Sequence, residues 1–158
     1  MFGLPADRPQ FYVSQHPGRE NTHFYGVLTL HTGEEIVLRS PKMNTEVSAF
    51  FLQKLLLAYP DKPLLLLWNR APWHRRPQIR QLLVDHPRLH IEFFPTAAPD
   101  LNPQEHVWKE TRCKVSYNHT ETKLNTLADR FQTHLETHIF PCSLLDQHDY
   151  HTIYMMFK

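Results

Sequence analysis

The sequence predicts an α/β domain in which a mixed sheet is flanked by helices. A β-hairpin pattern fills residues 23–39, and a continuous apolar run follows at Leu64–Trp68. Stretches with helical spacing of apolar residues lie between and after these strand patterns. Strands that alternate with helices are typical of a sheet with helices on its faces.

Length and composition indicate one globular domain covering residues 1–158. Hydrophobic residues make up 41% of the chain and charged residues 21%, which is close to the globular average. The 17 Lys and Arg residues nearly balance the 16 Asp and Glu residues. Any surface for nucleic acid must therefore be a local patch.

The two cysteines, Cys113 and Cys142, lack the CxxC spacing of a zinc site. We interpret them as reduced thiols of a cytoplasmic protein. The first ten residues do not resemble a signal peptide, and no apolar stretch is long enough to cross a membrane.

The hairpin is predicted from two β-rich stretches around a turn. His23–Leu30 and Glu35–Arg39 are the strands, and Thr32–Glu34 is the turn. Residues 1–22 are rich in Pro, Gly and polar residues, with one strand-like piece at Phe11–Ser14. Asn44 or Thr45 can cap a helix that runs to Tyr59.

The helix that ends at Tyr59 should bury one stripe of side chains, namely Val47, Phe50, Phe51 and Leu55. Leu64–Trp68 fits a central strand buried on both faces. A helix from Pro77, a strand at Ile91–Phe94 and a helix opened by Asn102-Pro103 follow.

An amphipathic helix is predicted from Thr120 to His138. Its stripe consists of Leu124, Leu127, Ala128, Phe131 and Leu135. Residues 141–158 end in an apolar cluster, Ile153–Phe157, and we expect this tail to pack against the domain.

Two motifs carry the chemistry. Trp68-Asn69-Arg70-Ala71-Pro72-Trp73-His74 ends the buried strand, where open α/β sheets place their ligands. The second motif runs from Pro95 to Trp108 and contains Pro99-Asp100-Leu101-Asn102-Pro103-Gln104-Glu105. Glu105 lies one turn inside a helix that follows the next strand, so Asn69 and Glu105 can reach one cleft.

These motifs resemble those of mariner-like transposases of bacterial insertion sequences, the DDE superfamily of endonucleases. In that family the second catalytic Asp ends a buried strand in a W-D-R/N-A-x-x-H pattern, and the third carboxylate lies in P-D/E-L-N-P-x-E-x-x-W. Here 35 residues separate Asn69 from Glu105, as in the family. The resemblance runs from about Asn21 to the C-terminus and includes Cys142-Ser143-Leu144-Leu145.

The resemblance implies an RNase H-like fold and a catalytic domain that cleaves and joins DNA with Mg²⁺ or Mn²⁺. Two such ions need several hard oxygen ligands, mostly carboxylates. The positions that match metal ligands are Asn69 and Glu105.

The sequence departs from the family pattern at two ligands. Asn69 stands where the second Asp belongs, and an amide oxygen carries no charge. The first Asp belongs on a strand ahead of the hairpin, and we expect the chain to begin after that strand. Only Asp7, in a Pro-flanked stretch, and Glu20 precede the hairpin as acids.

We therefore expect a transposase fragment that binds metal weakly and cleaves poorly. The alternative is a non-catalytic remnant that binds DNA or self-associates.

Each site residue also has a structural alternative. Asn102-Pro103-Gln104-Glu105 resembles a capping box, in which Glu105 would bond back to the cap. Asn69 can be a turn residue. His134 and His138 have the i, i+4 spacing of a metal pair, but without an evident third ligand we interpret them as surface residues.

Two basic stretches are candidates for contact with DNA phosphates, although solvated helix faces explain them equally well. They comprise Arg70, His74, Arg75, Arg76 and Arg80, and then Lys109, Arg112 and Lys114. Trp73 can stack on a base or pack half-buried. We expect Trp108 to belong to the core.

The implied fold places the strand of the first Asp between the hairpin and Leu64–Trp68. Without that strand, the two neighbours face an empty slot. An open strand edge invites pairing with another chain, so we expect a homo-oligomer joined near this edge.

Overall fold

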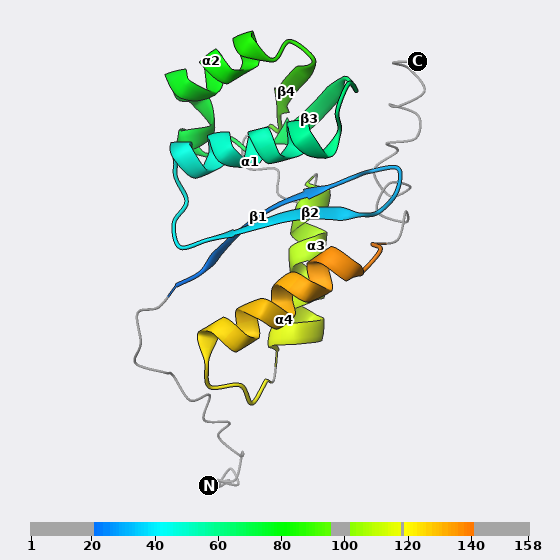
Figure 1. The fold of residues 1–158 in the computed structure, drawn as a ribbon. Helices are drawn as coiled ribbons and strands as arrows, with labels where there is room; N and C mark the ends of the chain where they lie inside the picture. The colour runs from blue at the N-terminus through cyan, green and yellow to red at the C-terminus, as the bar shows by residue number, and fades with distance from the viewer. Residues whose placement is uncertain (1–20, 96–101, 118, 141–158) are drawn as a thin grey trace, which may run out of the picture.

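The computed structural model describes residues 21–95, 102–117 and 119–140. Phe11–Ser14, Asp7, Glu20 and the tail at 141–158 lie outside the described residues. Figure 1 shows the β1–β2 hairpin between two groups of elements, with α1, α2, β3 and β4 on one side and α3 and α4 on the other.

The hairpin pairs β1 (His23–Leu28) with β2 (Glu35–Ser40) in antiparallel register, with Tyr25 opposite Leu38. Gly33 adopts a φ of 75° in the turn, a conformation that glycine reaches without a steric penalty. The predicted hairpin is confirmed, although the first strand ends at Leu28. Leu30 lies outside the ladder, in the turn. The backbone N–H groups of Thr32 and Gly33 close this turn by donating to the carbonyl of Thr29.

Helix α1 (Thr45–Ala58) begins after Asn44, whose side chain accepts a hydrogen bond from the Val47 N–H at 2.9 Å. Of the two caps that the sequence allowed, Asn44 is the one used. The predicted stripe is wrong at Phe50, which is 58% exposed. The face turned to the core carries Ser48, Phe51, Leu52, Leu55 and Leu56 instead.

Strand β3 (Leu64–Trp68) pairs in parallel with β4 (Leu89–Phe93), and α2 (Pro77–Asp85) connects them. Strand β4 begins two residues before its predicted start because the Arg88 carbonyl accepts from the Leu64 N–H and sets the register. The prediction that β3 is buried on both faces is wrong. Leu66 and Trp68 face the core, whereas Leu65 is 57% exposed.

Helix α3 (Pro103–Thr111) continues into the π-helical turn η3 (Arg112–Ser116), and α4 (Leu124–Thr137) follows. The last helix begins four residues later than the sequence predicts. The Glu121 carboxylate accepts hydrogen bonds from the Thr122 and Lys123 N–H groups, which holds the segment before Leu124 outside the helix. Ala128 and Leu135 are fully buried, as their stripe predicts.

Among the described residues the strands form two separate two-stranded sheets, β1–β2 and β3–β4. The larger core lies between α1, α2 and the β3–β4 sheet and includes Tyr25 of the hairpin. A smaller core lies between the other face of the hairpin and α3 and α4, around Val37, Val107, Leu135 and Phe140. The open edges of β1 and β3 therefore belong to different sheets.

Candidate active site

The candidate site is a groove of about 190 Å³ between the hairpin and the β3–β4 sheet. Its walls come from β1, β3, the loop that follows β3, and the first turns of α3. The polar residues at the groove are Asn69, His74, Asn102, Gln104 and Glu105, and the apolar ones include Val27, Leu65, Leu67, Trp73 and Trp108. Asn69 and Glu105, which the sequence assigns to one cleft, both line it.

Asn69 is exposed directly after β3 and forms a turn. Its Oδ1 accepts a hydrogen bond from the Ala71 N–H at 3.2 Å, and its backbone oxygen lies 3.1 Å from Nδ1 of His74. The turn-residue interpretation is thus confirmed. A carbonyl oxygen has a second lone pair, so the turn does not exclude metal ligation by Oδ1.

Glu105 is the third residue of α3 and its side chain is exposed. Asn102 caps the helix, because its Oδ1 accepts from the Gln104 N–H at 3.2 Å. Within the part of the chain that the structure describes, the Glu105 carboxylate makes no return bond to Asn102, so the capping box is incomplete. A carboxylate in the first turn is favoured by the helix dipole and is open to a ligand.

Gln104 anchors the first turn of α3 to the hairpin. Its Nε2 donates to Oε1 of Glu35 at 2.6 Å, and its Oε1 accepts from the Leu28 N–H at 3.2 Å. Gly26 permits this close packing: a side chain there would meet Gln104, Trp108 and Glu35. The position of Glu105 relative to β1 is thereby fixed.

Glu35 is a buried carboxyl group that the sequence prediction did not single out. Burial raises its pKa to about 8, although the hydrogen bond from Gln104 acts in the opposite direction. Strand alternation offered a signal, because Glu35 shares a face of β2 with the buried Val37. It lies beneath the anchor of α3 and outside the groove lining.

His74 does not serve as a phosphate-binding cation. It is 4% exposed, and its ring stacks on Trp68 with centroids 3.5 Å apart. Burial lowers its pKa to about 4, although the hydrogen bond to the Asn69 oxygen raises it. The imidazole is neutral at physiological pH, and the prediction that it contacts DNA is corrected.

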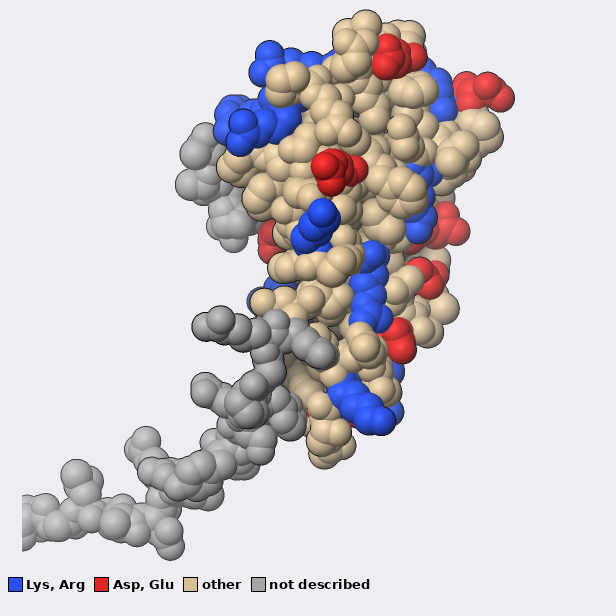
Figure 2. All heavy atoms as spheres, turned by 60° about the vertical axis from the view of Figure 1, so that its left-hand side comes forward, with Lys and Arg blue, Asp and Glu red and all other residues tan. Residues whose placement is uncertain are grey.

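The other predicted DNA-contact residues are exposed: Arg70, Arg75, Arg76, Arg80, Lys109, Arg112 and Lys114. Arg70 also donates to the Phe94 carbonyl at 2.8 Å, which holds its side chain across the ends of β3 and β4. Figure 2 shows a group of basic side chains at the upper left, acidic side chains at the same height, and further basic side chains lower on the same face.

The aromatic residues near the site are partly buried. Trp73 is half-buried, as the packing interpretation predicts, and lies edge-on to His74. Trp108 packs on the smaller core and stacks with Phe131 at 6.5 Å, which confirms its predicted core role.

The residues at the groove do not by themselves form a metal cage. Asn69 and Glu105 offer one neutral and one anionic oxygen, and no group of three or more His, Cys, Asp or Glu residues in the described ranges is arranged to hold an ion. His134 and His138 stack at 4.8 Å, and His138 pairs with Glu110 at 3.1 Å. His138 thus connects the end of α4 to α3, and both histidines are partly buried, so they are not purely surface residues.

No helix among the described residues is long and apolar enough to cross a membrane.

Comparison with known proteins identifies the family. Residues 4–128, most of the chain, match the family model of the DDE superfamily endonucleases. No curated protein matches the chain. The mixed α/β architecture agrees with the RNase H-like fold of such nucleases, which generally use divalent metals and interact with DNA. The chain belongs to the DDE superfamily endonuclease family.

Proposed function

We propose that this chain is part of the catalytic domain of a DDE-type, mariner-like insertion-sequence transposase, and that its strand cleavage and transfer are impaired. The observation that supports this most directly is that Asn69 and Glu105 line one groove, one after the end of β3 and one in the first turn of α3. Asn69 stands where the family has its second catalytic Asp, so this position carries a neutral amide in place of a negative charge.

In this proposal Glu105 is the anionic oxygen ligand and Asn69 the neutral one. Mg²⁺ or Mn²⁺ would supply charge stabilisation at the reacting phosphate. Replacing a carboxylate by an amide removes one full charge from the site, and Mg²⁺ gives up its water reluctantly. Metal binding is therefore weak, and cleavage is correspondingly slow.

The exposed cations contact DNA through its phosphates. Arg70, Arg75, Arg76, Arg80, Lys109 and Arg112 extend from the loop after β3, from α2 and from the end of α3. Such contacts neutralise phosphate charge without reading bases, so binding is independent of sequence and falls steeply with salt. A cytoplasmic location is part of the proposal, and the exposed free thiol of Cys113 suits a reducing compartment.

Plasmid nicking tests the catalytic part of the proposal. We expect no nicking of supercoiled DNA by the unmodified chain at millimolar Mg²⁺ or Mn²⁺. Asn69→Asp should raise Mn²⁺ affinity in calorimetry without restoring cleavage, because the described groove has no third carboxylate. The double variant Asn69→Asp, Glu105→Gln is the control and should lose the gain in affinity. Robust cleavage by the unmodified chain that is lost on Glu105→Ala would contradict the impairment.

Salt-dependent binding tests the DNA surface. Changing Arg75, Arg76 and Arg80 together to Gln should weaken binding to all sequences and lower the slope of log K against log salt by up to about 3. The matched control changes Lys42, Lys62 and Lys123 to Gln, which removes the same charge from exposed sites elsewhere. His74→Gln should leave the slope unchanged. Equal effects of the two triple variants would show that only net charge matters.

The second candidate is a non-catalytic protein that binds DNA or self-associates. The open edge of β3, with Leu65 57% exposed, favours association. Light scattering should then show a dimer or larger species that is lost on Leu65→Lys. A monomer at high protein concentration would exclude self-association, and the absence of salt-sensitive DNA binding would exclude the DNA-binding form of this candidate.

A further inference from the structure

An aromatic cluster closes the C-terminal end of α4, which lies across α3 in Figure 1. The imidazole rings of His134 and His138, one helical turn apart, stack with their centroids 4.8 Å apart. Both rings lie nearly perpendicular to the ring of Phe140, at centroid distances of 6.2 Å and 4.8 Å. Phe140 is buried in the smaller core and donates its backbone N–H to the Gly33 carbonyl of the hairpin turn at 2.9 Å. The two histidines therefore pack on the residue through which the end of α4 contacts the hairpin.

The Nε2 atoms of both rings are shielded from solvent. Neither atom has a hydrogen-bond partner within the described residues. Nε2 of His138 lies 3.1 Å from Oε1 of Glu110 in α3, outside hydrogen-bond geometry but close enough for an ion pair when the ring is charged. His134 forms no such pair with any described carboxylate. Protonation of His134 would thus place a second cation in the cluster without a second anion to balance it.

The surroundings of His134 favour its neutral form. Burial lowers the pKa of His134 below its usual value of 6.5, and the neighbouring His138 and Lys114 act in the same direction. The Glu110 carboxylate acts against them. Lys114 lies in η3, which packs on α4. Other titratable or charged groups one turn away, or in the hairpin turn, are His106, Arg130, His31 and Glu34.

We propose that His134, His138 and Glu110 form an acid-sensitive switch, which holds the end of α4 and Phe140 on the domain while His134 is neutral and releases them when both imidazoles are charged. Two stacked imidazolium rings repel each other, and one carboxylate can balance only one of them. Because the folded state disfavours a proton that the open state accepts, the stabilisation is present above about pH 6.5 and is lost as the pH falls below it. None of the three residues lines the groove, so the switch does not depend on the function proposed above.

Hydrogen exchange of the full chain at a series of pH values tests the switch. The measured quantity is the protection factor, which corrects for the intrinsic pH dependence of exchange. Below about pH 6.5, protection in the last turns of α4 should fall by up to about tenfold per pH unit, and protection in α1 should fall less. NMR of the imidazole rings should show His134 taking up its proton over the same pH range.

The same substitution at two histidines separates the switch from a general effect of acid. His134→Phe keeps an aromatic ring in the stack and removes the titrating group, so α4 should lose its excess pH dependence over α1. His90→Phe, at an exposed position of β4, is the matched control and should behave like the unmodified chain.

Two charge variants leave both rings in place, and they test the switch even where His134→Phe alters the packing. Glu110→Gln removes the charge that favours the imidazolium, so it should increase the loss of α4 protection in acid. Lys114→Gln removes a charge that opposes the imidazolium, so it should decrease that loss. The second effect should be smaller, because Lys114 is exposed and solvent screens its charge.

Three results would overturn the proposal. The first is α4 protection that does not change with pH, or that falls only together with that of α1. The second is an unchanged pH dependence in His134→Phe. The third is a change of the same sign in Glu110→Gln and Lys114→Gln, which would show that packing and not charge controls the end of α4.

Discussion

Glu35 is the side chain whose protonation the fold controls most strongly among the described acids. It is 7% exposed, and its Oε2 has no hydrogen-bond partner within the described residues. A buried carboxylate that lacks a cationic partner favours the protonated form, which is why its pKa rises to about 8. The same residue accepts the bond that anchors α3, so its charge affects the element that carries Glu105.

The raised pKa predicts that stability falls as the pH rises. Below pH 4.5 the group is protonated in both states and makes no difference. Between pH 4.5 and about 8 the unfolded chain loses the proton and the folded chain keeps it, so stability falls by up to about 1.4 kcal/mol per pH unit. Glu35→Gln should remove this slope, as urea unfolding at several pH values would measure. Parallel pH profiles for both proteins would contradict the assignment.

At the residue scale, the sequence predicts that Asn69 and Glu105 share a cleft, which the groove confirms, and it predicts the surroundings of that groove less well. Asn69 and Glu105 share a groove because the end of β3 and the start of α3 converge, as the motif spacing implies. The interpretation of His74 as a DNA contact is wrong because its ring stacks on Trp68, at the end of β3, a contact that the spacing of residues does not reveal. Glu35 was not singled out because a single acid in a strand shows nothing of the helix that covers it.

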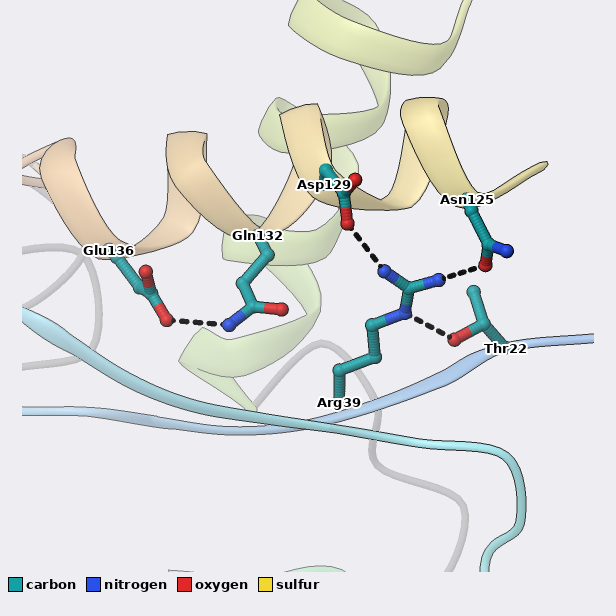
Figure 3. A network of polar contacts seen from close by, with 6 residues as sticks. All are labelled: Thr22, Arg39, Asn125, Asp129, Gln132 and Glu136. Atoms are coloured by element: carbon teal, nitrogen blue, oxygen red, sulfur yellow. Dashed lines mark hydrogen bonds and ion pairs between the residues drawn. The ribbon is translucent and has the colours of Figure 1, made fainter. Parts of the chain in front are cut away.

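Arg39 is the main polar link between the hairpin and α4 (Figure 3). Its guanidinium donates to Asp129 Oδ1 at 2.7 Å, to Asn125 Oδ1 at 2.6 Å and to Thr22 Oγ1 at 3.0 Å. The Arg39 side chain is 23% exposed, whereas Asp129 is 71% exposed. Solvent screens the ion pair, and the fixed geometry of three bonds accounts for most of the stabilisation.

Arg39→Lys should destabilise the protein by about 1 kcal/mol, because an ammonium group cannot reproduce the planar guanidinium that donates to three acceptors at once. A double-mutant cycle with Asp129→Asn would isolate the ion pair. Lys42→Gln is the control, since its pair with Glu46 is exposed at 3.8 Å and should be worth less than about 0.5 kcal/mol. Equal losses for Arg39→Lys and Lys42→Gln would show that the cluster contributes nothing specific.

Element positions were predictable where local chemistry sets them. The Asn44 cap, the Gly33 turn and the Pro103 start fixed α1, the hairpin and α3 close to their predicted bounds. The burial of faces was less predictable. Phe50 and Leu65 follow apolar patterns and are nevertheless exposed, because no described element packs over them. Sheet assembly depends on such neighbours, which local sequence does not reveal.

At the scale of the molecule, the hairpin is a partition between two cores of unequal size. Tyr25 and Val27 face the larger core, which also holds most of the buried residues of α1, α2, β3 and β4. Phe24 and Leu28 face the smaller core, whose buried cluster among the described residues consists of Val37, Val107, Leu135 and Phe140. Local stability follows the apolar surface that each unit buries, so the two sides of the hairpin should differ.

We therefore predict that α4 opens before the rest of the fold. Native-state hydrogen exchange should show α4 amides exchanging through a partial opening, while amides of α1 and β3 exchange only on global unfolding. Leu135→Ala, at a site with 0% exposure, should cost about 2–5 kcal/mol, and it should accelerate exchange in α4 without accelerating it equally in α1. Leu52→Ala, also at 0% exposure, is the matched control and should accelerate exchange on both sides, because the hairpin depends on the larger core. If Leu135→Ala speeds exchange equally in α1 and α4, the protein unfolds as one unit and the hairpin transmits stability in both directions.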